Sequence, residues 1–232
     1  MTLSILATQL ENSSIKINDL IKNVYFITGA AGSVGSELVR QLTDKGHKVL
    51  CWDINETALF DLIEELRLEG KNVEGRVGDI RNLKIMEDYF IQKPYPGTIF
   101  HCAALKHVTP CEWNPEEAVI TNVIGTYNVI QLAKKLGSKL INISTDKAVN
   151  PKSVMGMTKK ISEIMIQNAG FVSVRFANVL GSRGSVIPIW QKQIDEYKPI
   201  TITHPDMERY FMTISDAVDL ILKASEIGEP GD

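Results

Sequence analysis

Two hydrophobic patterns alternate along the chain. Short, continuous apolar runs predict buried strands, and longer segments between them carry apolar residues at helical spacing. The predicted strands cover residues 23–29, 47–53, 72–79, 97–104, 139–145 and 171–179. The predicted helices cover residues 33–46, 56–70, 116–137 and 153–170, and each of these segments closes on glycine. Strands that alternate with helices predict an α/β fold, a Rossmann-like doubly wound parallel sheet with helices on both faces.

The alternation loosens after Val179. The pattern there predicts a loop, a helix near 188–197, a short strand over 200–203 and a last helix over 215–228. We therefore expect three parts, which are an N-terminal arm over 1–22, a Rossmann domain over 23–178 and a small C-terminal lobe over 179–232.

Composition narrows the class of protein. The 232 residues are 44% hydrophobic and 23% charged, which suits one globular domain with a small appendage. The net charge is −3 and the basic residues are scattered, so we expect neither a nucleic-acid surface nor a membrane-binding patch. No apolar run approaches the ~18 residues that span a bilayer, and no signal peptide is expected. Cys51, Cys102 and Cys111 lack metal-ligand spacing, and we expect reduced thiols, no metal and a cytoplasmic location.

A glycine-rich turn joins the first predicted strand to the first predicted helix. Its glycines are Gly29, Gly32 and Gly35, a G-x-x-G-x-x-G spacing. One glycine permits a tight turn, one lets a phosphate approach the backbone, and one lets the helix pack on the strand. The helix N-terminus offers free N–H groups to a pyrophosphate. The turn therefore predicts a dinucleotide site, and the alternative is a glycine-rich turn without a ligand.

Acidic residues end the next two strands. Asp53 closes the second strand, 18 residues after Gly35, where a carboxylate accepts hydrogen bonds from an adenosine ribose. A carboxylate there disfavours a 2′-phosphate, so we expect NAD rather than NADP. Asp79 closes the third strand, and it either faces the adenine or caps a turn.

Several motifs together resemble a known family. The stretches "TGAAGSVG", "HCAALKH" and "TNVIGT" resemble the extended short-chain dehydrogenase/reductase superfamily. The stretches "STDKAVNP", "RFANVLGSRGSVIP" and "HPDMERYFMT" look like the nucleotide-sugar 4,6-dehydratases of polysaccharide biosynthesis that act on UDP-N-acetylglucosamine. The resemblance runs from Asn23 to the end of the chain. Large members carry an N-terminal membrane-spanning region, which is not expected here, and soluble members usually continue further, which implies a truncated substrate lobe.

One position departs from the superfamily pattern. Its Tyr-x-x-x-Lys motif is here Met155 and Lys159. Helical spacing predicts that the core-facing stripe of this helix is Met157, Ile161, Ile164 and Met165. Met155 is then off the core and beside Lys159, although ordinary core packing is an alternative, since Ile166 shares its face. A thioether is no base, and the resemblance implies that methionine forms retain the configuration at C5.

The resemblance implies a reaction in three steps. Hydride passes from C4 of the sugar to NAD, water leaves from C5 and C6, and the hydride returns to C6. Asp146 is then the acid toward the 6-hydroxyl and Lys147 the base at C5, which requires a raised carboxyl pKa and a lowered amine pKa. The alternative for this pair is a solvated ion pair on a loop. Ser144 and Thr145 would bond the 4-hydroxyl and Lys159 the nicotinamide ribose, while the C4 base stays open, with Thr145 and a water relay to Lys159 as one option.

Further contacts follow from the same resemblance. The expected cofactor contacts are Gly29, Gly32, Ser33, Val34, Gly35, Asp53, Ile54, Asn55, Asp79, Ile80, Ala103, Ala104 and Lys159. The expected contacts to the UDP-sugar are Lys106, His107, Asn178, Arg183, Ser185 and Arg209. Arginines suit a diphosphate, and the alternative for Arg183 and Arg209 is a surface salt bridge. His107 is more often structural, and Asn122 is expected to bond backbone near the site.

Two other functions stay open. A C4 epimerase would use the same scaffold, but it needs no acid and base at C5 and C6. A non-catalytic dinucleotide sensor would bind the cofactor without turnover. In either case the helices over 116–136 and 152–168 resemble those that pair subunits in the superfamily, so we expect a homo-oligomer.

Overall fold

Six parallel strands form the central sheet in the computed structural model, which describes residues 24–202 and 204–232. The strands are β1 (Val24–Thr28), β2 (Lys48–Asp53), β3 (Val73–Val77), β4 (Thr98–His101), β5 (Lys139–Thr145) and β6 (Val172–Phe176). Their spatial order is β3-β2-β1-β4-β5-β6, the order of doubly wound dinucleotide-binding folds. The predicted fold class is confirmed. The expected arm over 1–22 lies outside the described residues.

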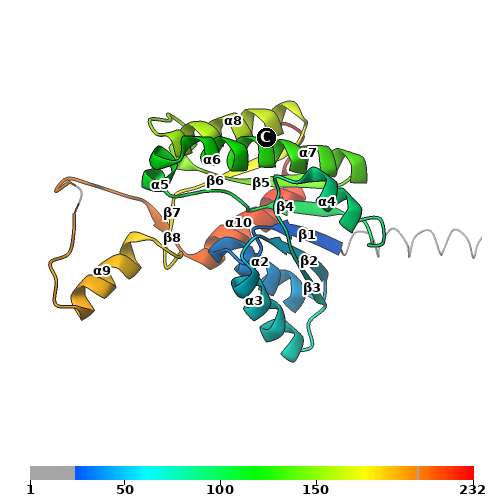
Figure 1. The fold of residues 1–232 in the computed structure, drawn as a ribbon, viewed down its shortest axis with the longest axis horizontal. Helices are drawn as coiled ribbons and strands as arrows, with labels where there is room; N and C mark the ends of the chain where they lie inside the picture. The colour runs from blue at the N-terminus through cyan, green and yellow to red at the C-terminus, as the bar shows by residue number, and fades with distance from the viewer. Residues whose placement is uncertain (1–23, 203) are drawn as a thin grey trace, which may run out of the picture.

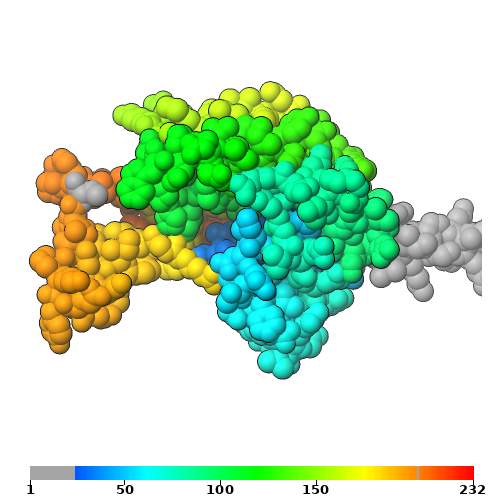
Figure 2. Space-filling model, viewed as in Figure 1, coloured from blue at the N-terminus to red at the C-terminus, as the bar shows by residue number. Residues whose placement is uncertain are grey.

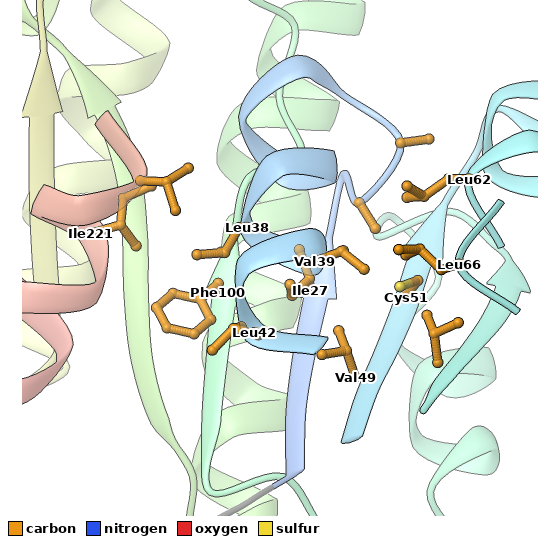
Figure 3. Packing of buried hydrophobic residues seen from close by; sticks show 14 of the residues in the cluster. Ile27, Leu38, Val39, Leu42, Val49, Cys51, Leu62, Leu66, Phe100 and Ile221 are labelled. Atoms are coloured by element: carbon orange, nitrogen blue, oxygen red, sulfur yellow. The ribbon is translucent and has the colours of Figure 1, made fainter. Parts of the chain in front are cut away.

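Helices cover both faces of this sheet (Figure 1). One face carries α2 (Ser33–Asp44), α3 (Glu56–Leu68) and α10 (Ile214–Ile227), and the other carries α4 (Leu83–Tyr89), α7 (Gly125–Leu136) and α8 (Val154–Asn168). Figure 3 shows the first of the two cores, where Leu38 and Leu42 of α2 pack near Ile27 and Phe100 of the sheet. The sheet is therefore buried on both faces, which explains its continuous apolar runs.

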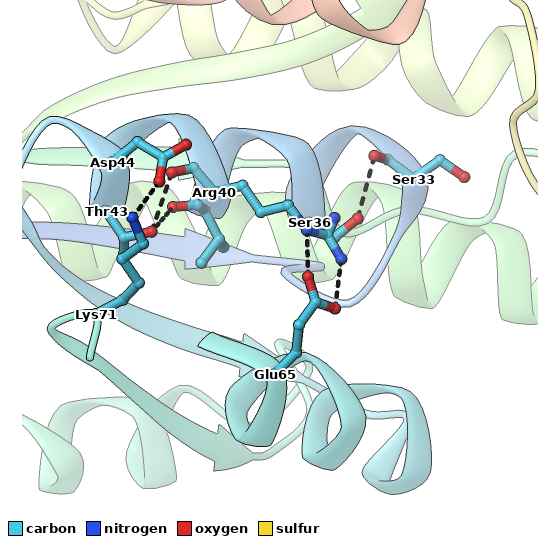
Figure 4. A network of polar contacts seen from close by, with 8 residues as sticks. Ser33, Ser36, Arg40, Thr43, Asp44, Glu65 and Lys71 are labelled. Atoms are coloured by element: carbon cyan, nitrogen blue, oxygen red, sulfur yellow. Dashed lines mark hydrogen bonds and ion pairs between the residues drawn. The ribbon is translucent and has the colours of Figure 1, made fainter. Parts of the chain in front are cut away.

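Surface ion pairs add little to this packing. Figure 4 shows Arg40 of α2 paired with Glu65 of α3, and Lys71 paired with Asp44. These side chains are partly exposed, and such pairs contribute about 0–1 kcal/mol each. The position of α2, and with it the glycine turn, is therefore set mainly by the apolar core.

The long helix expected over 116–137 is interrupted. It consists of α6 (Pro115–Val119), a π-helical turn over Ile120–Ile124 and α7. The short helices α4 and α5 (Val108–Trp113) were not predicted from the sequence. A π-helical turn inserts one residue into the helical repeat, and this one contains Asn122, which faces the loop after β4 through its side-chain bonds to Leu105.

The predicted core-facing stripe of α8 is wrong for three of its four residues, while Met165 packs against the core as predicted. Met157, Ile161 and Ile164 are 50%, 45% and 45% exposed. The buried residues of the helix are instead Met155, Gly156, Thr158, Lys159, Ser162, Glu163 and Ile166. The periodicity misled because the part of the sheet under α8 is itself polar, with Ser144 on β5 and Arg175 on β6. Lys159 and Glu163 of α8 therefore find hydrogen-bond partners on the sheet, at the Ile143 carbonyl and at Arg175.

The C-terminal segment contains both an extension and a core helix. β7 (Asn178–Val179) pairs in parallel with β8 (Phe211–Met212), and α9 (Val186–Asp195) extends away from the sheet (Figure 1). Residues 200–202 adopt no strand conformation, unlike the prediction for 200–203. α10 returns to the main core with Ala217, Val218 and Ile221. The α10 part of the lobe predicted over 179–232 therefore packs with the predicted Rossmann domain. No helix among the described residues is long and apolar enough to cross a membrane.

An ion pair between a buried carboxylate and a partly exposed guanidinium joins α8 to the sheet edge, and its loss should destabilise the fold. Arg175 donates two hydrogen bonds of 2.8 Å to Glu163, whose side chain is 1% exposed. Arg175→Met would leave the buried carboxylate with only the 3.8 Å contact to Lys160, so we expect a loss of about 1–3 kcal/mol of unfolding free energy. Urea denaturation measures this, and Arg67→Met, which breaks an exposed pair on α3, should cost under about 0.5 kcal/mol.

The pH dependence of this loss has a defined sign. Burial alone would raise the pKa of Glu163, but the two hydrogen bonds and the positive charge of Arg175 hold it below the ordinary value of 4.5. A lowered carboxyl pKa stabilises the fold above pH 4.5, and this contribution disappears as the pH falls through the folded-state pKa. The difference in unfolding free energy between Arg175→Met and the wild type should therefore become smaller in acid. A difference that does not change with pH would contradict the electrostatic explanation.

Candidate functional site

A cavity of ≈ 1030 Å³ lies at the carboxyl ends of the strands. In Figure 2 the surface is hollowed between the helices drawn in green and the segments drawn in cyan and yellow. The predicted residues that line the cavity are Gly29, Gly32, Ser33, Val34, Gly35, Asp53, Ile54, Asn55, Asp79, Ile80, Ala103, Ala104, Lys106, His107, Ser144, Thr145, Lys147, Met155, Lys159, Asn178, Arg183, Ser185 and Arg209. Asp146 is the predicted site residue that is absent from this lining. Ligands of doubly wound sheets bind at this edge.

The glycines of the turn allow a close approach of backbone to backbone at the start of α2. Gly29 has φ +67°, and a Cβ there would lie 2.5 Å from Ala103 N. A Cβ on Gly35 would lie 2.1 Å from the Gly29 carbonyl oxygen. Gly32 caps α2 without any side-chain hydrogen bond, so the first N–H groups of the helix stay open to an anion. The residues present therefore fit a dinucleotide pyrophosphate.

Gly35→Ala should damage this turn and weaken dinucleotide binding. The added methyl would meet backbone at 2.1 Å, so α2 or the turn must shift. We expect the Kd for NAD to rise by at least about tenfold, measured by calorimetry, because a misplaced pyrophosphate loses charge-assisted hydrogen bonds. Gly46→Asn is the control, since Gly46 closes the same helix at φ +81° with no atom near its Cβ position. Unchanged NAD binding by Gly35→Ala would contradict this function of the turn.

The two acidic residues at the cavity wall have different partners. Asp53 accepts hydrogen bonds from Ala31 N (2.9 Å) and Asn55 N (2.8 Å), which braces the glycine turn against β2. Asp79 accepts bonds from the backbone and side chain of Arg81. Burial alone would raise the pKa of Asp79, but these bonds keep it below its ordinary value. The geometry thus supports the turn-capping alternative for Asp79.

Lys159 and Met155 both lie at the inner wall of the cavity. Lys159 is 6% exposed and its Nζ donates a 2.6 Å hydrogen bond to the Ile143 carbonyl. Burial lowers the pKa of Lys159 to about 8. Met155 lines the cavity but also packs with Cys111 and Ala118 in a small buried cluster. The expectation that Met155 lies off the core is therefore wrong, and the core-packing alternative applies together with its cavity position.

Asp146 and Lys147 form a close ion pair directly after β5. Lys147 Nζ donates to Asp146 Oδ1 at 3.0 Å and to Asn178 Oδ1 at 3.2 Å, and Thr145 Oγ1 donates to Asp146 Oδ1 at 2.9 Å. Burial alone would raise the pKa of Asp146, but the bonds from Lys147 and Thr145 lower it below the ordinary value. The raised carboxyl pKa expected from the sequence is therefore wrong for this arrangement of the side chains.

A buried polar layer behind the cavity was not predicted as part of the site. His101 bonds Thr28 Oγ1 through Nδ1 (2.7 Å) and Thr126 Oγ1 through Nε2 (3.0 Å). Burial lowers the pKa of His101 to about 3, so the imidazole is neutral. Asn122 bonds both the N–H and the carbonyl of Leu105, which confirms the expectation that it bonds backbone. The sequence signal for this layer is His101, a histidine within the apolar run that forms β4.

The loop over 181–185 crosses the glycine turn. Arg183 N donates to Ser33 Oγ (3.0 Å) and Arg183 Nη1 donates to the Ala31 carbonyl (3.2 Å). Lys106 Nζ donates to the Arg183 carbonyl (2.7 Å), and burial lowers the pKa of Lys106. Arg209 also lines the cavity, with a bond from Nη1 to the Glu208 carbonyl. Neither arginine forms a side-chain salt bridge within the described part of the chain.

Known proteins resemble this chain in sequence over most of its length. The model of a family described as polysaccharide biosynthesis protein matches residues 25–232. The capsular polysaccharide biosynthesis protein CapD of Staphylococcus aureus is 42% identical over 230 residues, which are 92% of this chain and 38% of CapD. The UDP-glucose 4-epimerase of Rickettsia rickettsii is 37% identical and matches 91% of this chain and 65% of its own length. The chain thus spans less than two thirds of these relatives.

Solved structures resemble the fold over most of the chain. The X-ray structure of Pen from Bacillus thuringiensis matches with a TM-score of 0.84 and 36% identity, over 91% of this chain and 67% of Pen. A double mutant of DesIV, a dTDP-glucose 4,6-dehydratase from Streptomyces venezuelae with NAD bound, matches with a TM-score of 0.80 over 89% of this chain and 73% of its own. Its identity is 20%, so this likeness concerns the fold alone.

Proposed function

Because the chain belongs to the polysaccharide biosynthesis protein family, we propose that it is an NAD-dependent 4,6-dehydratase that converts UDP-N-acetylglucosamine to the UDP-4-keto-6-deoxy sugar. One observation carries the proposal. A carboxylate and an amine, Asp146 and Lys147, lie 3.0 Å apart after β5, and Lys147 lines the same cavity as the glycine turn and Lys159. Dehydration needs an acid and a base close together at neighbouring carbons, and this pair supplies both.

The cofactor would lie along the glycine turn. NAD, when bound, accepts a hydride from C4 of the sugar and later returns it to C6. Gly29, Gly32 and Gly35 leave space for its pyrophosphate, and Asp53 would accept a bond from the adenosine ribose. The negative charge of Asp53 would repel a 2′-phosphate, which favours NAD over NADP. Lys159 would bond the nicotinamide ribose and favour loss of the proton from the 4-hydroxyl through its positive charge.

The chain's own residues would then remove water. Asp146 would protonate the departing 6-hydroxyl while Lys147 takes the proton from C5. A proton must first pass from the Lys147 ammonium to the Asp146 carboxylate, which leaves a neutral base and a protonated acid, and the ion pair opposes this transfer. We propose that the sugar separates the two side chains, so that the pKa of Asp146 rises in the complex. A water relay from Thr145 to Lys159 would need the neutral amine, whereas we propose that Lys159 acts as a cation, so the C4 base is a group other than Lys159. Met155, which is no base, accords with retention at C5.

A C4 epimerase is the second candidate. It is favoured by the Rickettsia rickettsii relative, which is named UDP-glucose 4-epimerase. The Asp146–Lys147 pair favours dehydration, because epimerisation at C4 requires no acid or base at C5 and C6. A third possibility, a sensor that binds NAD without turnover, would also need no such pair.

Mass spectrometry separates the three functions. The protein is incubated with UDP-N-acetylglucosamine and catalytic NAD, and we expect a product lighter by one water without net formation of NADH. A product of unchanged mass with inverted C4 would establish the epimerase. NAD binding without any product would establish the sensor, and either result would refute the dehydratase.

We also propose a homo-oligomer in the cytoplasm. Met157, Ile161 and Ile164 on α8, with Ile124 and Tyr127 on the neighbouring π-helical turn and α7, present partly exposed apolar side chains. A second copy that covers this face would remove them from water. Ile161→Glu should therefore shift the sedimentation coefficient toward the monomer, while Leu68→Glu at the exposed end of α3 should not. A monomeric wild-type protein would contradict the proposal.

The proposed cytoplasmic location is supported by the cysteines. The three cysteines are free, as in a reducing compartment.

A further inference from the structure

The loop over 181–185, called the strap below, is bonded to the cofactor side of the cavity. Its attachments are the Arg183 backbone to Ser33 Oγ at 3.0 Å, the Arg183 guanidinium to the Ala31 carbonyl at 3.2 Å, and Lys106 to the Arg183 carbonyl at 2.7 Å. Ala31 belongs to the glycine turn, and Ser33 is the first residue of α2. The strap therefore contacts the segment that would hold a dinucleotide pyrophosphate.

Two glycines shape the strap around Arg183. Gly181 and Gly184 both have φ +69°, a left-handed conformation that side chains disfavour. A Cβ on Gly184 would lie 2.7 Å from His107 Cε1, so the strap runs close over the loop after β4. Lys106 bonds the carbonyl of Arg183 and Ser33 bonds its N–H, so the backbone of Arg183 is held at both groups. Its side chain reaches the glycine turn.

Two charged side chains bond the glycine turn, Asp53 at Ala31 N and Arg183 at the Ala31 carbonyl. The first turn of α2 carries no acidic side chain, and its N-cap makes no side-chain bond. Among the described residues, Arg183 is the cation whose side chain is bonded to the turn. A pyrophosphate carries negative charge that backbone N–H groups solvate only in part, and a guanidinium matches phosphate oxygens with its planar fork. The sequence had assigned Arg183 to the substrate, whereas these contacts lie on the cofactor side.

We propose that Arg183 binds the pyrophosphate of NAD, and that the strap thereby couples cofactor binding to binding of the UDP-sugar. This inference rests on the proposed function. The strap ends at Ser185, which lines the cavity and precedes α9 in the extended C-terminal segment. Arg183 and Ser185 lie on the same short strap and both line the cavity, so an anion that draws Arg183 toward the turn also positions the strap where the second ligand binds. Because such coupling is reciprocal, UDP should tighten NAD binding by the same factor.

Calorimetry with Arg183→Gln tests the assignment. We expect the Kd for NAD to rise at least about tenfold, since a charge-assisted hydrogen bond is lost, with a similar rise for ADP-ribose. Binding of adenosine, which lacks the pyrophosphate, should not change, and neither should binding of UDP without NAD. The wild type should bind UDP about fivefold or more tightly with NAD present, and the variant should lose this enhancement. Lys192→Gln, an exposed cation on α9, is the control, and Arg183→Lys should recover part of the loss.

Three other results would overturn the inference, and a fourth would overturn only the proposed function. Weaker UDP binding with unchanged NAD binding would assign Arg183 to the substrate. Equal losses for adenosine and ADP-ribose would indicate general distortion of the site. A wild type that binds no NAD would refute the proposed function as well. A wild type that binds NAD without eliminating water would refute only the proposed function, because the effects of Arg183→Gln on NAD would remain.

Discussion

Asp146→Asn is expected to slow the elimination of water by about 10²–10⁴-fold, the usual contribution of a general acid. The amide keeps the size of the side chain and its contact with Thr145, but it cannot protonate the departing 6-hydroxyl. Product formation from UDP-N-acetylglucosamine, followed by mass spectrometry, measures the loss. NAD affinity should be unchanged, because Asp146 bonds Thr145 and Lys147 after β5 and makes no bond to the glycine turn. Lys147→Ala should cause a similar loss by removing the base.

The control for this prediction is Asp219→Asn, an exposed carboxylate on α10. Its rate of water elimination should equal that of the wild type. Full activity in Asp146→Asn would contradict the acid role. Thermal denaturation shows whether the variant is folded, so that a loss of activity through unfolding is recognised. The lowered pKa of Asp146 makes this test necessary, since the ion pair alone favours an ionised carboxylate.

Lys159→Met is expected to reduce turnover by at least about 10²-fold, because the buried cation that polarises the 4-hydroxyl is lost. In the wild type, burial lowers the pKa of Lys159 from 10.5 to about 8. The rate should therefore fall as the pH rises through about 8, where the ammonium loses its proton. A pH–rate profile measures this. Lys159→Arg keeps the charge at all pH values and should lose the decline near this pKa.

The same shift has a consequence for stability. Between pH 8 and 10.5 the unfolded chain holds a proton on Lys159 that the folded chain has released. Stability of the wild type relative to Lys159→Met should therefore rise with pH across this window.

For the pH–rate profile, a decline that persists unchanged in Lys159→Arg would contradict the assignment of this pKa to the reaction.

Local signals predicted the sheet and the glycine turn well. The six strands follow from apolar runs because parallel strands are buried on both faces, and the turn follows because Gly29 and Gly35 occupy positions where a Cβ would collide with backbone. The fold class therefore needed only residues near each other in sequence.

Features that depend on distant residues were not predictable in this way. The buried face of α8 is polar because β5 and β6 place Ser144 and Arg175 beneath it, and a helical period cannot report the chemistry of a neighbouring strand. The low pKa of Asp146 depends on where Lys147 and Thr145 point. The strap reaches the glycine turn across 150 residues, from Arg183 to Ser33, and no spacing in the sequence joins the two.

Isotope transfer tests the central claim most directly. The claim is that a hydride leaves C4 of the sugar and returns to C6 of the same molecule after Asp146 and Lys147 have removed the 6-oxygen as water. UDP-N-acetylglucosamine with deuterium on C4 should give a 4-keto product that carries the deuterium on C6. Deuterium returned to C4 of a sugar that keeps its 6-hydroxyl, or released to solvent, would contradict the account.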